Sequence, residues 1–250
     1  MRVRSLRFFV PIGQMRLDLV YSKITEGSNV SETEDDGHLS FAYLTIRNKP
    51  KLKLDTYIIN NNIKGVSETT SYGFRLKGRF RNIDWRTENI LQEQSLKNKS
   101  AYSLNFESGY NINNSYRLFL RHSRNSSSYD HLYTNRHFYN GIIDLIGRRN
   151  INNFSGGVSG KLSDSFNVKF KALFFSLNKL GVSAYNLSTS APIAGNNLNK
   201  SVGREYDFLL QYKKNQYESM ALGYSYFDHG DYFVNLDKSQ FIYLQYRFSI

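Results

Sequence analysis

The chain has 250 residues, a net charge of +12 and no cysteine, and 15% of its residues are aromatic. The lack of cysteine excludes disulfide scaffolds, thiolate metal sites and cysteine nucleophiles. The mean hydropathy of −0.52, with no apolar run near the roughly 18 residues that a spanning helix needs, excludes a helical membrane protein. It does not exclude a barrel of transmembrane strands, which is apolar only at alternate residues.

The N-terminus does not have the pattern of a secretory signal peptide. Its apolar stretch, residues 6–10, is short, and Pro11 and Arg16 follow soon after it. Because an exported protein needs such a signal, we expect a processed or N-terminally truncated chain.

Along the chain, hydrophobic and polar residues alternate in segments of about ten residues, the length of a tilted membrane strand. An early example is residues 52–58, where Leu52, Leu54 and Ile58 oppose Lys53 and Asp55. The clearer segments that follow are residues 72–80, 102–110, 116–121, 168–174, 205–212, 219–226 and 241–250. We expect about 12–14 strands in all, a number within the range of membrane barrels.

The links between these segments alternate in length. The short links are residues 48–50, 111–114, 163–165 and 213–216, and the long ones are 27–37, 125–153, 178–202 and 228–237. Outer-membrane barrels have this asymmetry between periplasmic turns and extracellular loops. The sequence therefore predicts an all-β, antiparallel transmembrane β-barrel, with residues 1–250 as one outer-membrane domain. A soluble sandwich also alternates, but its strands are shorter, most often about 5–6 residues.

The polar face of the predicted strands is basic. Its candidate channel-lining residues are Arg75, Lys77, Arg79, Arg117, Arg121, Lys169 and Lys171. Acidic residues alternate with them: Asp55, Asp84, Glu88, Glu107, Glu205 and Asp207. An excess of positive charge in a pore attracts anions, and arginine binds carboxylates with two parallel hydrogen bonds. Phe241 and Tyr243 on the same face are suited to stacking on sugar rings. The alternative is that these charges pair with one another and stiffen the wall.

The basic face predicts an anionic polysaccharide or other anionic solute as a partner. The barrel fold predicts outer-membrane lipid and the barrel-assembly machinery as further partners, and we expect no nucleic acid. We find no G-x-S-x-G elbow and no H-E-x-x-H motif, and the five histidines fall at strand ends or in loops. We therefore expect no enzymatic activity, no cofactor and no metal site. A structural or adhesive barrel with surface-binding loops is the alternative function, and a barrel hydrolase is a third.

Two stretches resemble the alginate-export outer-membrane barrels. The first is residues 136–150, with an aromatic residue and glycine, then aspartate, an apolar pair with glycine, and asparagine. The second comprises the segments G-R-E-Y-D, G-Y-S-Y-F, G-D-Y-F and Y-L-Q-Y-R-F at residues 203–207, 223–227, 230–233 and 243–248. The resemblance is clearest over residues 130–250.

This resemblance implies a single barrel of about eighteen strands with an electropositive channel for passive transport of anionic polysaccharide such as alginate. On that count the chain would lack N-terminal strands. Four residues lie inside matching motifs, and the resemblance places them in the channel: Arg204, Glu205, Asp207 and Arg247. The chain departs from the family pattern at Phe248, which two more residues follow, whereas family members usually end on phenylalanine.

Overall fold

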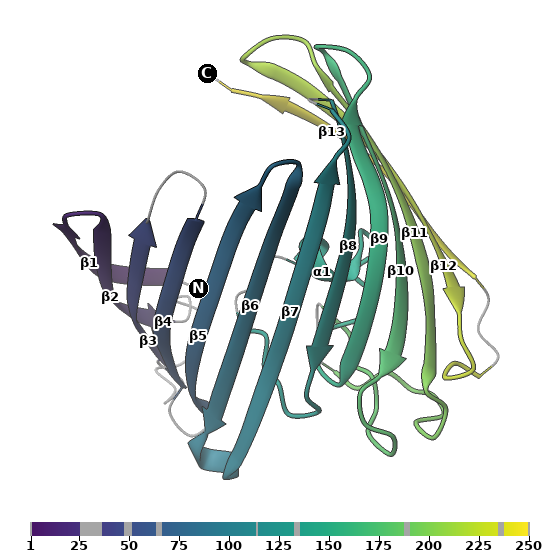
Figure 1. Ribbon diagram of the computed structural model, residues 1–250. Coiled ribbons are helices and arrows are strands. Elements are labelled where there is room, and N and C mark those ends of the chain that lie inside the picture. The colour runs from purple at the N-terminus through teal and green to yellow at the C-terminus, as the bar shows by residue number, and fades with distance from the viewer. Residues whose placement is uncertain are drawn as a thin grey trace. The chain divides into compact units, whose positions relative to one another are not determined.

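The structure is a computed structural model. It describes residues 2–25, 37–47, 52–63, 67–113, 115–132, 136–187, 191–234 and 238–249. In these ranges it has thirteen β-strands, a five-residue α-helix and one turn of 3-10 helix. The strands lie in the sheet in the same order as in the sequence, and every described pairing is antiparallel (Figure 1). The expected all-β antiparallel fold and strand number are confirmed.

The strands are 10 to 14 residues long. Their bounds are β1 Arg2–Ile12, β2 Met15–Thr25, β3 Gly37–Arg47, β4 Leu52–Ile63, β5 Ser67–Phe80, β6 Ile83–Gln94, β7 Lys99–Asn111, β8 Tyr116–Asn125, β9 Ile151–Lys161, β10 Phe166–Leu177, β11 Ser201–Lys213, β12 Glu218–His229 and β13 Ser239–Phe248. The helix α1 is Arg136–Asn140, and the 3-10 turn is Ser95–Lys97. The chain forms two compact units, residues 1–80 with 86–104 and residues 81–85 with 105–250.

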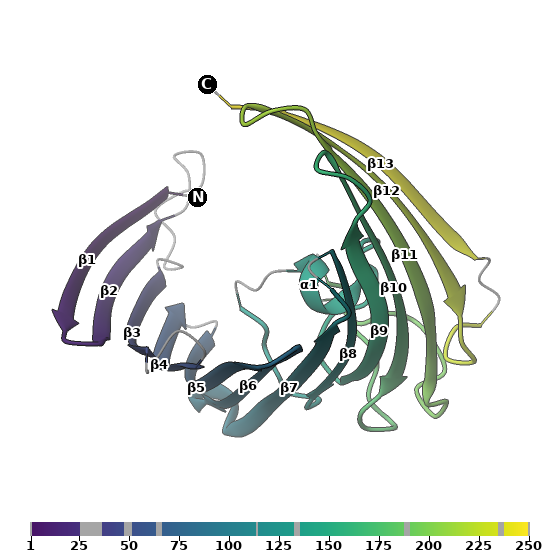
Figure 2. The same cartoon turned by 45° about the horizontal axis from the view of Figure 1, so that its top comes forward.

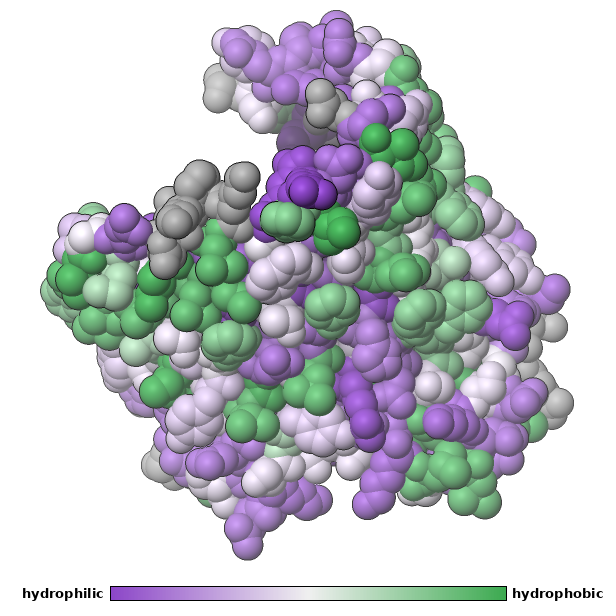
Figure 3. All heavy atoms as spheres, viewed as in Figure 1, coloured by the Kyte–Doolittle hydropathy of each residue, from purple (hydrophilic) through white to green (hydrophobic). Residues whose placement is uncertain are grey.

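In the second unit, side chains alternate between two faces. Phe170 and Phe174 are each 43% exposed, whereas Lys171 and Leu173 between them are buried. We call the face of Phe170 the outer face and that of Lys171 the inner face. The outer face also exposes Leu118, Leu120, Phe154, Phe208, Leu222, Tyr224, Ile242 and Leu244. On the side seen in Figure 3, hydrophobic side chains gather over the middle of this unit's strands. Such a surface is stable against lipid, as the alternating pattern predicts.

The first unit alternates in the same way. Ile58 on β4 and Phe74 on β5 are exposed, whereas Asp55 and Ser71 are buried on the opposite face. Directly opposed residues of antiparallel strands point to the same side of a sheet, so Thr45 on β3 lies on the polar face with its register partner Asp55.

Three short turns of the second unit share one construction. In each, a polar side chain accepts hydrogen bonds from the backbone N–H groups two and three residues later. Asn113 accepts from Ser115 and Tyr116 at 2.8 and 2.9 Å, and Asn215 accepts from Tyr217 and Glu218 at the same two distances. Ser163 does the same in the β9–β10 turn. Asparagine and serine at these sites thus replace a strand pairing with a local turn.

At the opposite end of the strands, the long links pack against the sheet. Inner-face residues of β9 to β12 and residues of the links form one hydrophobic core: Ile146, Ile151, Leu173, Phe175, Leu177, Ala184, Val202, Phe227, Tyr232 and Phe233. The Tyr232 hydroxyl donates to the Ile193 carbonyl at 2.6 Å and so ties two links together. The sequence had led us to expect an inner face that is polar along its whole length. The structure differs, because this face is apolar at the end of the long links. In the described ranges, no helix is long and apolar enough to cross a membrane.

Candidate functional site: the charged inner face

On the inner face of the second unit, the strand register decides which charges meet. Lys171 on β10 lies directly opposite Asp207 on β11, whereas Lys169 lies opposite Leu209. Lys171 and Asp207 form an ion pair of 3.1 Å, with both side chains almost fully buried. The Ser225 hydroxyl, next along the same row, donates to Asp207. Two lysines that are two residues apart therefore have different electrostatic surroundings.

Arg117 and Arg121 on β8 share the carboxylate of Glu107. Arg117 Nε donates to Asp84 Oδ2 at 2.9 Å, and its Nη2 donates to Glu107 Oε1 at 2.9 Å. Arg121 Nε donates to Glu107 Oε2 at 2.8 Å. Two guanidinium groups and two carboxylates thus form one cluster with no net charge. At this cluster the charges pair with one another, as the alternative interpretation of the polar face expects.

Between β8 and β9 the chain folds back onto the inner face, so that α1 lies on the concave side of β8 to β10 (Figure 2). The guanidinium of Arg121 donates to the carbonyl oxygen of Phe138 and lies 3.8 Å from the centroid of its ring. Asn153 Nδ2 donates to the Tyr139 carbonyl oxygen at 2.6 Å. Arg148 lies 4.1 Å from the centroid of the Tyr139 ring. The link is thus held on the sheet by β8 and β9.

Glu205 on β11 holds the same link from the other side. Its Oε1 accepts hydrogen bonds from the backbone N–H groups of Ile142 and Ile143 at 2.7 and 3.1 Å. Gly141 precedes them with φ +89°, and a Cβ there would lie 2.1 Å from Glu205 Oε1. Only glycine combines this backbone conformation with so close an approach. Glu205, which the resemblance placed in the channel, is fully buried and positions the folded-back link.

Between this link and the sheet lies a cavity of about 630 Å³. It is lined by Ile142, Ile143, Asp144, Lys169, Lys171, Asp207, Leu209, Phe241, Tyr243 and Gln245. The rings of Phe241 and Tyr243 are neighbours, with centroids 5.9 Å apart. Lys169 also borders a second hollow of about 330 Å³ toward the short turns, together with Arg117, Ser159 and Gln211. Lys169 therefore stands where two open spaces of the inner face meet.

Lys169 is the inner-face cation of β10 that has no ion pair. No carboxylate of the described residues forms an ion pair with it, and its Nζ lies 5.5 Å from the centroid of the Phe119 ring. The charges around it are mixed, since Lys171 and Arg121 carry the same charge and Glu107 and Asp207 the opposite one. The ammonium group of Lys169 therefore produces a positive potential in the two hollows that it borders.

The first unit has its own charged cluster around Arg75. Arg75 Nε lies 3.5 Å from both Asp55 Oδ2 and Glu88 Oε1, and its Nη2 donates to the Tyr43 hydroxyl at 2.5 Å. The rings of Tyr43 and Tyr57 are stacked, with centroids 5.3 Å apart. Lys77, two residues along β5, has no ion pair with the carboxylates of the described residues. Arg79 is exposed on the same face toward the end of the strand.

One predicted lining residue lies on the wrong side. Arg204 was expected in the channel, but it is directly opposite Phe174 in the register, and Phe174 is on the outer face. Its neighbour Glu205 points inward, as strand alternation requires. Arg247, by contrast, shares the face of Tyr243 and Gln245 and lies at the short-turn end of β13.

Sequence reasoning also missed Phe138, Ile142, Ile143 and Arg148, because it treated their segment as a surface loop. The segment does contain hydrophobic residues within a polar link, and these now pack on the inner face. Among the described residues, no group of three or more histidine, cysteine, aspartate or glutamate side chains is placed to hold a metal ion.

Strands of this length, with an apolar exposed face and a charged inner face, define an outer-membrane channel built as an antiparallel β-barrel. The model of the alginate export family matches residues 13–246. The chain therefore belongs to the alginate export family and is located in the outer membrane. No curated protein sequence matches it significantly.

Several solved structures have the same fold. OccK11 (OpdR) of Pseudomonas aeruginosa matches with a TM-score of 0.65 at 13% identity, over 98% of this chain and 70% of that one. OccK10 (OpdN) of the same organism matches with a TM-score of 0.65 at 10% identity, over 98% and 73%. The outer-membrane channel DcaP of Acinetobacter baumannii matches with a TM-score of 0.53 at 11% identity, over 98% and 84%. At these identities the likeness concerns the fold alone.

Proposed function

We propose that this outer-membrane channel passes anionic, carboxylate-bearing saccharides by passive diffusion, without a covalent step. The observation that carries the proposal is Lys169, a cation at the junction of two inner-face hollows that has no ion pair among the described residues. The paired cations of the same face have their charge largely cancelled by nearby carboxylates. The unpaired ammonium is therefore the group best placed to attract a carboxylate from solution.

The surroundings of Lys169 suit a sugar ring. The cavity of about 630 Å³ has the size of a site for one small molecule or a short stretch of polymer. Phe241 and Tyr243 offer ring faces, and Gln245 and Asp207 offer hydrogen-bonding groups in the same lining. A uronate residue has a carboxylate, hydroxyl groups and an apolar ring face, and so matches each of these features.

The test is ion selectivity in planar lipid bilayers with the full chain. In a KCl gradient we expect a reversal potential that indicates anion selectivity, and we expect an oligouronate to reduce the current more than a neutral oligosaccharide of equal length. Lys169→Gln should lower both the anion selectivity and the block. Lys179→Gln, which removes an exposed lysine in the β10–β11 link, is the matched control. Cation selectivity of the unaltered protein would contradict the proposal, as would equal effects of the two variants.

A structural or adhesive barrel remains the second candidate, because the cluster of Arg117, Arg121, Asp84 and Glu107 is internally neutral. On that reading the inner-face charges serve the wall alone, and the packed links present a binding surface. A protein that binds to cell surfaces and conducts no ions in bilayers would favour this candidate over the channel.

A further inference from the structure

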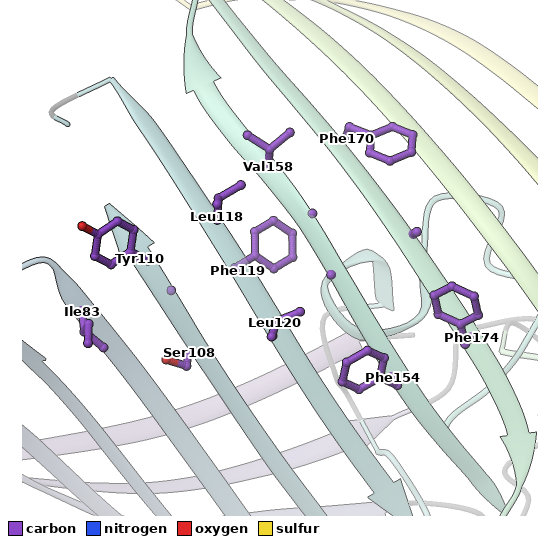
Figure 4. A pocket seen from close by; sticks show the side chains of 14 residues that line it. Ile83, Ser108, Tyr110, Leu118, Phe119, Leu120, Phe154, Val158, Phe170 and Phe174 are labelled. Atoms are coloured by element: carbon purple, nitrogen blue, oxygen red, sulfur yellow. The ribbon is translucent and has the colours of Figure 1, made fainter. Parts of the chain in front are cut away.

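The outer face of the second unit carries a hollow of about 750 Å³ (Figure 4). Three successive rows of directly opposed residues on β9 and β10 form it: Phe154 with Phe174, Gly156 with Ala172, and Val158 with Phe170. The middle row has almost no side chain, whereas the rows on either side are bulky. The result is a trough about one residue wide over β9 and β10.

On β8 the middle row holds Leu120, which lies directly opposite Gly156, and Leu118 lines the hollow in the next row. Leu120 reaches over the glycine of the middle row, since its Cδ2 lies 3.0 Å from where a Cβ of Gly156 would be. Because this face meets the membrane, hydrocarbon rather than water fills such a hollow. Any acyl chain satisfies that condition, so the trough alone does not select a lipid.

The lipid is selected by polar residues at the rim of the trough, by which we mean its edge toward the long links. The row of Phe154 and Phe174 continues in register to His122 on β8 and to Arg204 on β11. Arg124 lies on the same face, two residues closer to the links, and its Nε donates to Asn178 Oδ1 at 2.9 Å. All three polar side chains are exposed. At about 3.3 Å per residue, Arg204 lies about 7 Å along the strand from the trough floor, so one lipid can reach both.

Arg204 has an acidic neighbour, Asp228, directly opposite on β12. No ion pair joins the two among the described contacts, although they face each other in register. The rim thus has two arginines and a histidine against one carboxylate. Arginine beside a membrane surface binds phosphate oxygens with its planar pair of donors.

We propose that the trough binds an acyl chain of an anionic, phosphate-bearing lipid, whose headgroup Arg204 holds at the level of the long links, with Arg124 as a second cation of the same rim. The apolar floor takes the chain, and the basic rim distinguishes this lipid from a zwitterionic one with the same chains. Arg204, misplaced in the channel by sequence reasoning, has its role on this outer surface.

The test is native mass spectrometry of the full chain in micelles that contain equal amounts of phosphatidylglycerol and phosphatidylcholine with identical acyl chains. We expect at least one phosphatidylglycerol to stay bound after the detergent is stripped, in about fivefold preference or more over phosphatidylcholine. Ala172→Leu, which fills the trough, should remove retention of both lipids. Leu222→Phe adds bulk elsewhere on the outer face and should leave retention unchanged.

A second pair of variants tests the headgroup at exposed positions where folding is not at risk. Arg204→Gln combined with Arg124→Gln should abolish the preference for phosphatidylglycerol, whereas Arg247→Gln on the inner face should keep it. Equal retention of the two lipids by the unaltered protein would overturn the proposal. So would unchanged retention in Ala172→Leu, or a dimer that Ala172→Leu dissociates, because a second copy would then occupy the trough.

Discussion

The carboxylate of Glu205 accepts a 2.7 Å hydrogen bond from the backbone N–H of Ile142, 63 residues earlier in the chain. A second N–H, that of Ile143, donates to the same oxygen. This contact fixes the folded-back link over the cavity, so the size of the cavity depends on a residue of β11.

Glu205→Ala should release this link. The two backbone N–H groups lose their acceptor, and a buried donor without a partner costs about 1–3 kcal/mol. A loss of one or two kcal/mol changes the ratio of docked to undocked link by a factor of about 5–30. Limited proteolysis should therefore cut within residues 126–150 several times faster in the variant than in the unaltered protein. Equal cleavage rates would show that β8 and β9 hold the link without Glu205.

Gly141→Ala should have the same effect from the other side of the contact. Its Cβ would lie 2.1 Å from Glu205 Oε1, at a residue with φ +89°. Gly181→Ala is the matched control, because Gly181 also has a positive φ, +75°, but nothing within 4 Å of its Cβ position. Backbone strain is common to both variants, whereas the clash occurs only in the first. Faster proteolysis of residues 126–150 in Gly141→Ala alone would assign the effect to Glu205.

The sequence pattern predicts which face of a strand a residue lies on, but it does not predict the register between neighbouring strands. Alternation with period two placed residues 168–174 in a strand and assigned the faces of Phe170 and Lys171 correctly. It could not tell that Lys171 lies opposite an aspartate and Lys169 opposite a leucine, since this depends on how β10 and β11 align. The resemblance to the family motifs predicted that Arg204 lies in the channel. In the structure it lies on the outer face, because it is directly opposite Phe174.

The alternation of hydrophobic and polar residues also did not predict the hydrophobic core under the long links. Ile146 and Tyr232 lie in segments rich in polar residues, and such segments are predicted to be exposed loops. They are buried because inner-face residues such as Leu173 and Phe227 are apolar at that end of the strands. Strand periodicity reports which face a residue takes, and it does not report what covers that face.

The cluster around Glu107 should stabilise the wall. Glu107→Gln leaves Arg117 and Arg121 with one charged partner fewer, and a hydrogen bond to a charged group contributes about 1.5–3 kcal/mol. We expect the urea midpoint of unfolding to fall in this variant. Glu93→Gln, at an exposed position of β6, should leave the midpoint unchanged. The double variant Glu107→Gln with Arg121→Gln should lose less than the sum of the single losses, because the two side chains interact directly.

Ionic strength should separate the function of Lys169 from that of the paired cations. The screening length falls from about 10 Å at 0.1 M salt to about 3 Å at 1 M, so the field that an open-facing ammonium group sends into the pore weakens. The anion preference of the unaltered protein should therefore decline as KCl is raised. In Lys169→Gln the preference should be smaller from the start, by at most about fivefold, because one unit charge at about 4 Å in water is worth about 1 kcal/mol. A preference that persists undiminished at 1 M KCl would point to the width of the cavity, rather than the charge of Lys169, as the source of selectivity.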